Sequence, residues 1–193
     1  DLGDPREARR VVRAARRRLG GLDIVVVNHG VWPPDDVPLA KLPDTQWEQT
    51  RLANLDAVFY VCRAAIPELA PGGTIVLVSS TAGQRGEAFH ADYAATKGAL
   101  IALTKSLAVE LAPSITVNCV APGWVDTEMA APAWEHGKRE TANAKRKIAA
   151  TIPLGRIAAP EDIAGPIVFL CSPLARHITG EVLNVNGGSV LCG

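Results

Sequence analysis

Short apolar runs alternate with longer amphipathic segments along this chain. The short runs, four to six residues each, cover residues 24–27, 74–78, 115–120 and 182–185. Runs of this kind are typical of strands that are buried on both faces of a sheet. The intervening segments repeat apolar residues every three or four positions, which predicts helices over residues 5–19, 44–69, 93–111 and 160–171. Residues 31–43 are predicted as loop, and residues 122–153 as an irregular stretch with short helices.

The first predicted helix has signals at both of its ends. Asp4 can cap it, Pro5 suits the first helical position, and Glu7 would complete a capping box. Gly20 is a typical residue at the end of a helix. Because the sequence opens with Asp1 and this helix start, we expect it to begin in the middle of a fold.

The alternation of strands and helices predicts parallel βαβ units. Right-handed crossovers would then give an α/β fold with a doubly wound parallel sheet of the Rossmann type. Ligands of such sheets bind beyond the carboxyl ends of the strands. Chemistry is therefore expected in the segments that follow the four strands: Asn28-His29-Gly30, Ser79-Ser80-Thr81, Pro122-Gly123-Trp124 and Asn186-Gly187-Gly188.

Composition and charge argue against several classes of partner. The 193 residues carry 20 basic and 20 acidic side chains, so a nucleic acid or an anionic membrane is not expected. Neither a membrane-spanning stretch nor a secretory leader is recognised. The four cysteines are widely separated without metal-ligand spacing, so we expect no metal site. Reduced thiols and a cytoplasmic location are the expectation.

One predicted helix carries a phenol and an ammonium group four residues apart. Tyr93 and Lys97 would share a helix face, where the cation favours phenolate and lowers the tyrosine pKa from about 10. Such a tyrosine can exchange a proton near neutral pH. The spacing alone also occurs on ordinary surface helices. Ser80 follows the second strand and could hold a substrate oxygen beside Tyr93, or it could simply satisfy backbone groups in a turn.

Together these residues resemble the catalytic pattern of the short-chain dehydrogenase/reductase family. Ser80 stands thirteen residues before Tyr93, and Lys97 stands four residues after it. Further segments match the family in the same order: Val27-Asn28-His29-Gly30, Arg51-Leu52-Ala53-Asn54-Leu55, residues 118–127 and residues 178–188. The resemblance extends over essentially all 193 residues.

The resemblance implies a role for each matching residue. Tyr93 would be the general acid in reduction and the base in oxidation, Lys97 would lower its pKa and bind the nicotinamide ribose, and Ser80 would polarise the substrate oxygen. Asn54 would hold a water in a proton relay, although a mid-helix asparagine can also bend its helix and bond backbone. The further cofactor contacts that the resemblance implies come from Asp1, Asn28, Gly30, Pro122, Gly123, Val125 and Thr127.

The implied activity is hydride transfer between NAD or NADP and a small-molecule ketone or secondary alcohol. Residues 115–118, 126–129, 152–156 and 160–164 most resemble 3-oxoacyl-(acyl-carrier-protein) reductases. Sugar, polyol and steroid dehydrogenases of the family share these features and remain alternatives. A substrate lid is expected over residues 129–151. The basic residues of this lid could bind an acidic carrier protein, or they could simply form a solvent-exposed helix face.

The glycine-rich turn with which the family opens, Gly-x-x-x-Gly-x-Gly, does not occur in this sequence. Asp1 resembles the aspartate that ends the family's third strand. The resemblance therefore implies one N-terminally incomplete domain over residues 1–193 that lacks its first three strands. Residues 24–27 would then be an exposed apolar edge. The competing interpretation is a truncated, non-catalytic subunit that serves only in oligomers.

Two of the predicted helices are more apolar than a monomer requires. Residues 93–111 carry small and apolar side chains around most of the helix, and residues 44–69 have a similar excess. Family members pair these helices across a two-fold axis. The resemblance therefore implies a homotetramer, with a dimer as the next possibility.

Overall fold

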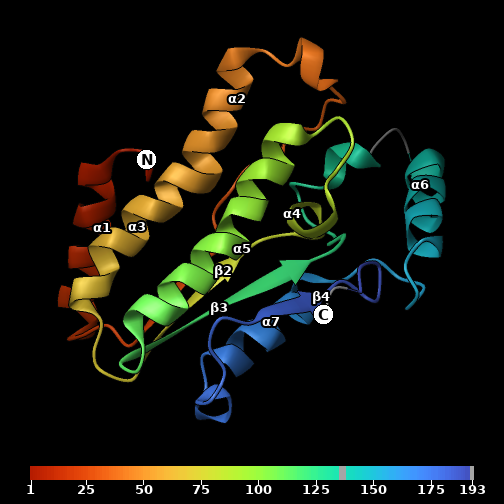
Figure 1. The fold of residues 1–193 in the computed structure, drawn as a ribbon. Helices are drawn as coiled ribbons and strands as arrows, with labels where there is room; N and C mark the ends of the chain where they lie inside the picture. Colours follow the sequence, from red (N-terminus) through yellow and green to blue (C-terminus); the bar gives the residue numbers. More distant parts are fainter. Residues whose placement is uncertain (135–137, 192–193) are drawn as a thin grey trace.

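The computed structural model describes residues 1–134 and 138–191, and its fold is drawn in Figure 1. Four parallel strands form one sheet in the order β1-β2-β3-β4. The strands are β1 (Ile24–Val27), β2 (Gly73–Val78), β3 (Ile115–Pro122) and β4 (Val182–Val185). The prediction of an α/β fold with a parallel sheet is therefore confirmed.

Seven α-helices surround the sheet within the described residues. They are α1 (Pro5–Leu19), α2 (Asp44–Arg51), α3 (Ala57–Ala65), α4 (Thr81–Arg85), α5 (Ala91–Leu111), α6 (Lys138–Ala150) and α7 (Pro160–Leu170). A π-helical turn over Leu52–Asp56 joins α2 to α3, so the predicted helix over residues 44–69 is one continuous helical segment. None of the described helices has the length and apolar character needed to cross a membrane.

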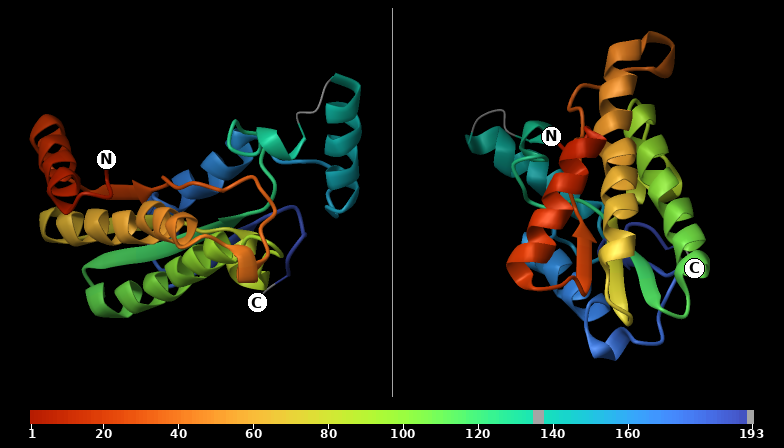
Figure 2. Two further views of the ribbon diagram at one scale, coloured as in Figure 1. Left: turned by 90° about the horizontal axis from the view of Figure 1, so that it is seen from above. Right: turned by 90° about the vertical axis from the view of Figure 1, so that its left-hand side faces the viewer.

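Different helices cover the two faces of the sheet. α3 and α5 run side by side over one face, where Ile75 and Leu77 of β2 enter the larger core cluster. α7 covers the opposite face (Figure 2). Val76 of β2 and Ile163 of α7 belong to the core cluster on that face. Because successive strand residues point to opposite faces, all six positions of β2 are buried. An uninterrupted apolar run is the sequence consequence of this two-sided burial.

The crossover connections cannot all be right-handed, contrary to the prediction. The β1–β2 and β2–β3 crossovers carry α3 and α5 over one face, whereas the β3–β4 crossover carries α7 over the other. The strand order nevertheless continues in one direction. The last crossover therefore has the opposite hand. Residues 123–159 precede α7, and so long a connection can pass around the sheet in a way that a short βαβ unit cannot.

The irregular stretch that was predicted after β3 contains a regular helix. α6 has thirteen residues and is rich in Lys, Arg, Glu and Ala, which are good helix formers. Ile148 is its one large apolar residue, so apolar periodicity predicts only short helices where α6 lies. Intrinsic propensity was the signal that could have revealed α6.

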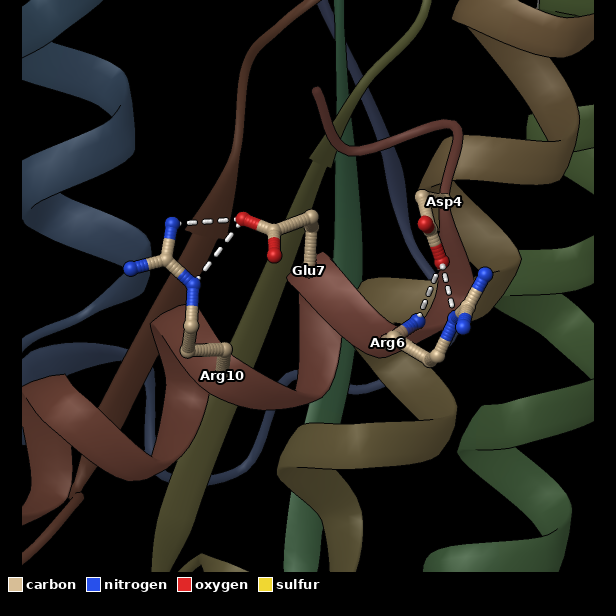
Figure 3. Close-up of polar contacts among 4 residues, drawn as sticks. All are labelled: Asp4, Arg6, Glu7 and Arg10. Carbon is tan, nitrogen blue, oxygen red and sulfur yellow. Dashed lines mark hydrogen bonds and ion pairs between the residues drawn. The ribbon is translucent and has the colours of Figure 1, made fainter.

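The N-terminus of α1 is capped more simply than predicted. The Asp4 carboxylate accepts a hydrogen bond from the Arg6 backbone N–H at 2.7 Å. Glu7 does not complete a capping box, because its carboxylate accepts from Arg10 Nε at 2.9 Å (Figure 3). The Asp4 backbone N–H, which a capping box would use, donates instead to the Asp1 carbonyl oxygen at 3.3 Å.

β1 is an exposed edge strand, as predicted for residues 24–27 of this sequence, although its apolar run alone suggested burial on both faces. Val27 is buried, but Ile24 and Val26 are 48% and 42% exposed. Among the described strands β1 pairs with β2 alone. The strand is thus an exposed apolar edge. The prediction that the domain lacks three further strands stays a prediction.

Candidate active site

A cavity of about 520 Å³ opens at the carboxyl ends of the strands. Ligand sites of parallel α/β sheets lie at this edge, and small-molecule sites commonly enclose about 300–1,000 Å³. Tyr93 and Lys97 reach the cavity from the first two turns of α5, and Ser80 reaches it from the end of β2. Most of the predicted cofactor contacts also line it, namely Asn28, Gly30, Pro122, Gly123, Val125 and Thr127.

Ser80 has the turn-capping role that the sequence suggested, and its role toward a substrate oxygen stays a prediction. It is the N-cap residue of α4, and its Oγ accepts the Ala82 backbone N–H at 3.1 Å. The same hydroxyl also acts on Tyr93 through a hydrogen bond that favours the phenolate. The capping hydrogen bond fixes the position of Ser80 Oγ, and in that position the hydroxyl faces the Tyr93 phenol.

Lys97 is buried beside the Tyr93 ring. Its ammonium group donates to the Val78 carbonyl oxygen at 3.0 Å and lies 5.8 Å from the centroid of the Tyr93 ring. Burial penalises the charged form and lowers the pKa of Lys97 to about 8. The group therefore changes charge much closer to neutrality than an exposed lysine does.

The pKa of Tyr93 is raised, whereas the sequence predicted that Lys97 would lower it. Burial of the phenol is the main cause, the Ser80 hydroxyl opposes the shift, and the carboxylate of Glu87 adds to it. Burial also destabilises the charge of Lys97 itself. In this structure burial, and not pairing with Lys97, sets the direction of the Tyr93 pKa shift, and the prediction is corrected.

Asn54 sits in the π-helical turn and is fully buried. Its Oδ1 accepts the Val31 backbone N–H at 2.7 Å, and its Nδ2 donates to the Val31 carbonyl oxygen at 2.9 Å. The Nδ2 atom also donates to Thr96 Oγ1 at 3.3 Å. The side chain thus binds the loop after β1 to the helical layer. π-Helical turns are frequent at functional sites, and the proposed water relay through Asn54 stays a prediction.

Two glycines allow the backbone to approach the cavity closely. A Cβ atom at Gly30 would lie 3.0 Å from Asn54 Oδ1 and 3.3 Å from Lys97 Nζ. A Cβ atom at Gly123 would lie 3.1 Å from the Cβ of Asn186. Side chains at these positions would crowd the cavity or its wall. The open backbone beside a buried lysine fits the nicotinamide end of a dinucleotide.

Asp1 lies apart from the other predicted cofactor contacts. It lines a second cavity, of about 680 Å³, beside α2. Its carboxylate accepts the Gly3 backbone N–H at 2.8 Å. The two cavities share Val31 and Trp32 in their linings. The implied contact between Asp1 and an adenine ring stays a prediction.

Two residues near Ser80, namely Ser79 and Gly83, position Lys97 and were not predicted as site residues. The buried Ser79 hydroxyl donates to the Lys97 carbonyl oxygen at 2.7 Å. A Cβ atom at Gly83 would lie 2.6 Å from the Lys97 carbonyl carbon, so α4 and α5 can touch only because residue 83 is glycine. The run of small residues Ser79-Ser80-Thr81-Ala82-Gly83 was the signal for this close approach.

One wall of the cavity is aromatic. Trp32 stacks on His90 with ring centroids 4.9 Å apart and meets Trp124 edge-on at 6.1 Å. Trp124 in turn lies 5.9 Å from the buried Trp134. Trp32 and Trp124 both line the cavity. Trp32 and Trp124 therefore give the cavity an aromatic surface, and Trp134 packs behind Trp124.

The expected lid, residues 129–151, contributes to this wall in part. Met129 lines the cavity, while His136 lies outside the described residues. Lys145 of α6 lies 5.0 Å from the ring centroid of Trp134 and pairs with Asp126 at 2.7 Å. Lys145 thus links α6 to the segment after β3 through an ion pair and a ring contact.

Comparisons with known proteins agree over nearly the whole chain. The family model described as enoyl-(acyl carrier protein) reductase matches residues 1–189. The 3-oxoacyl-[acyl-carrier-protein] reductase of Aquifex aeolicus (strain VF5) is 40% identical over 171 residues, which are 87% of this chain and 65% of that protein. Dehydrogenase/reductase SDR family member 4 of Bos taurus is 38% identical over 192 residues, which are 98% and 67%. The chain thus spans about two-thirds of the length of these relatives.

Solved structures share the fold. A short-chain dehydrogenase/reductase from Brucella melitensis, described as a glucose/ribitol dehydrogenase, superposes with a TM-score of 0.91 at 37% identity, over 100% of this chain and 75% of that one. The aldohexose dehydrogenase of Thermoplasma acidophilum gives a TM-score of 0.94 at 26% identity, over 98% and 76%.

Proposed function

Because the chain belongs to the short-chain dehydrogenase/reductase family, we propose that its cavity serves hydride transfer between NAD or NADP and a ketone or secondary alcohol. The observation that supports this most directly is the convergence of Ser80, Tyr93 and Lys97 on one cavity at the carboxyl edge of the sheet. A serine hydroxyl, a phenol and a buried amine are what proton transfer to or from a substrate oxygen requires.

The bound nicotinamide would supply the hydride in reduction and accept it in oxidation. Lys97, held by the Val78 carbonyl, would bind the nicotinamide ribose. The backbone at Gly30 and Gly123 would approach the cofactor, because no side chain stands there. The remaining proposed contacts are Asp1, Asn28, Tyr93, Pro122, Val125 and Thr127.

Tyr93 would move the proton. Its raised pKa keeps the phenol protonated at neutral pH, which suits a general acid that protonates the carbonyl oxygen during reduction. The Ser80 hydroxyl would hold that oxygen and stabilise the charge that develops on it. In oxidation Tyr93 would act as the base, and Asn54 would hold the water that relays the proton toward Lys97.

Replacing Tyr93 with phenylalanine tests this proposal. Tyr93→Phe deletes the transferred proton and little else, so turnover should fall more than about a hundredfold while NAD(P)H affinity stays near the wild-type value. Ketone-dependent loss of nicotinamide absorbance measures the first quantity, and cofactor fluorescence measures the second. Turnover above about a tenth of wild type would contradict the role of Tyr93.

A 3-oxoacyl thioester is the first proposed substrate, supported by the names of relatives such as the Aquifex aeolicus and Vibrio cholerae 3-oxoacyl-[acyl-carrier-protein] reductases. A sugar or polyol is the second, supported by the names of both solved structures. We further propose a cytoplasmic homotetramer. Phe59 on α3 and Val109 on α5 are 45% and 83% exposed, which supports pairing of these helices with a second copy.

A further inference from the structure

Glu87 is the acidic residue among the described side chains that line the cavity, and the proton transfer proposed above does not use it. Its side chain is 23% exposed. Burial raises the pKa of its carboxyl group, while the charge of His90, the hydrogen-bonding indole of Trp32 and the charge of Arg85 act in the opposite direction. A partly desolvated carboxylate is costly unless something else binds it.

The segment that carries Glu87 has an unusual backbone. Gly86 has φ +78° and ψ 166°, a region that is essentially reserved for glycine, and Phe89 has φ +68° although it has a side chain. The Phe89 carbonyl oxygen accepts the Val37 backbone N–H at 3.1 Å, which ties this segment to the loop after β1. Conformations of this cost are typical of functional sites, where the surrounding structure holds them.

The surroundings of Glu87 suit a particular kind of ligand. The carboxylate has about four lone-pair sites, and the Trp32 indole can use only one of them. His90 Nδ1 lies 4.0 Å from Glu87 Oε1, so His90, like Arg85, acts on the carboxylate through its charge and not through a hydrogen bond. Its charge acts on the Tyr93 phenol in the same cavity. The faces and edges of Trp32 and Trp124 offer a surface for carbon–hydrogen groups or for a cation.

We propose that Glu87 is a specificity-determining residue that binds a hydroxyl or ammonium donor on the substrate while Trp32 and Trp124 contact the carbon skeleton. The proposal rests on the proposed function of the cavity. Of the two substrate classes proposed above it therefore favours the second, namely compact hydroxy- or amino-substituted ketones and the corresponding diols or amino alcohols, over a 3-oxoacyl thioester with a long acyl chain. An apolar chain would exclude water from the carboxylate without replacing its hydrogen bonds.

Three methyl ketones of nearly equal size test the proposal: hydroxyacetone, aminoacetone and 2-butanone. They differ in one terminal group, which is a hydroxyl, an ammonium or a methyl. Tryptophan fluorescence of the full chain, titrated with each ketone, measures the binding affinities, because Trp32 and Trp124 line the cavity. We expect hydroxyacetone or aminoacetone to bind about tenfold more tightly than 2-butanone.

Two variants separate the chemistry of the donor. Glu87→Ala should bring the affinities for all three ketones within about twofold of each other. Glu87→Gln keeps an acceptor oxygen for Trp32, so it should retain part of a preference for hydroxyacetone but lose a preference for aminoacetone, which needs the charge. Glu110→Gln, at an exposed carboxylate near the end of α5, is the matched control and should change nothing.

Equal affinities of the wild type for the three ketones would overturn the proposal, as would a preference that survives Glu87→Ala. If Glu87→Ala does not fold, the near-isosteric Glu87→Gln still tests whether the preference for aminoacetone depends on the charge of Glu87. The wild-type affinities for the three ketones still test whether the cavity prefers a hydrogen-bond donor. Fluorescence binding does not require hydride transfer. A selective cavity without ketone-dependent NAD(P)H oxidation would therefore contradict the proposed function alone, and oxidation without selectivity would contradict the role of Glu87 alone.

Discussion

Lys97 shows how a single buried residue couples the site to the stability of the fold. Its ammonium has one hydrogen bond to the protein backbone and lies beneath an aromatic ring, so burial lowers its pKa to about 8. In the unfolded chain the pKa of a lysine is about 10.4. Between these two values the unfolded chain binds the proton more strongly than the folded one.

The sign of this linkage gives a prediction. The contribution of Lys97 to the free energy of unfolding should rise as the pH rises from about 8 to about 10.4, because the unfolded state binds more protons over that range. Urea unfolding at pH 7 and pH 9.5 measures the rise. Lys97→Met removes the titrating group, so its stability should change less between the two pH values than that of the wild type. An equal change in both proteins would refute the lowered pKa.

Sequence spacing identified Ser80, Tyr93 and Lys97 but could not predict their electrostatics. The spacing of residues along a helix determines which side chains share a face, and that is a local property. The pKa of Tyr93 depends instead on burial beneath α4 and on Glu87, which the strained segment after α4 brings into the cavity. Neither the burial nor that backbone conformation has a simple pattern in the sequence.

At the scale of elements, the contact between α4 and α5 places the serine and the tyrosine side by side. Gly83 permits it, since a Cβ atom there would lie 2.6 Å from the Lys97 carbonyl carbon and 2.7 Å from the Gly98 backbone nitrogen. Both are backbone atoms, which cannot rotate away as a side chain can.

Gly83→Ala should therefore push α4 and α5 apart. We expect the free energy of unfolding to fall by about 1–3 kcal/mol, and turnover to fall with it, because Ser80 moves away from Tyr93. Gly165→Ala is the matched control: no atom lies within 4 Å of its ideal Cβ, and alanine is favoured within α7. Denaturant unfolding together with steady-state kinetics measures both effects. A Gly83→Ala variant as stable and active as Gly165→Ala would show that the helices can adjust freely.

Apolar runs predicted the four strands to within two residues at either end, because two-sided burial produces an uninterrupted run. Apolar periodicity predicted only short helices where α6 lies, because that helix depends on propensity, and it did not predict the π-helical turn within residues 44–69. It also gave the wrong hand for one of the crossovers. The handedness of a crossover depends on which face of the sheet its helix covers. The sequence around the strands does not specify that face.

At the scale of the whole molecule, apolar surface remains on the helices away from the sheet. The exposed large residues there include Trp47 and Leu52 as well as Phe59 and Val109. Ala102 is exposed on α5 between the buried positions Leu100 and Thr104. A two-fold pairing of these helices would cover this surface with an identical one.

Ala102→Glu should disrupt such an assembly, since each two-fold pair would bury two like charges. Light scattering at micromolar concentration should give the mass of a tetramer for the wild type and a smaller mass for the variant. Turnover should fall as well, because α5 also carries Tyr93. Ala150→Glu, at an exposed alanine that ends α6, introduces the same charge away from this surface and should not change the mass. A monomeric and fully active wild type would rule the assembly out.

The π-helical turn at Asn54 lets one helix hold an extra residue without losing its phase. Each residue of an α-helix turns the chain by about 100°, whereas a π-turn spreads about one turn over one residue more. The extra residue therefore widens the backbone locally, at Leu52–Asp56, while α2 and α3 stay aligned. Thr50 Oγ1 still donates to the buried Asp92 carboxylate at 2.8 Å. One helix thus meets the loop after β1 with Asn54 and the start of α5 with Thr50.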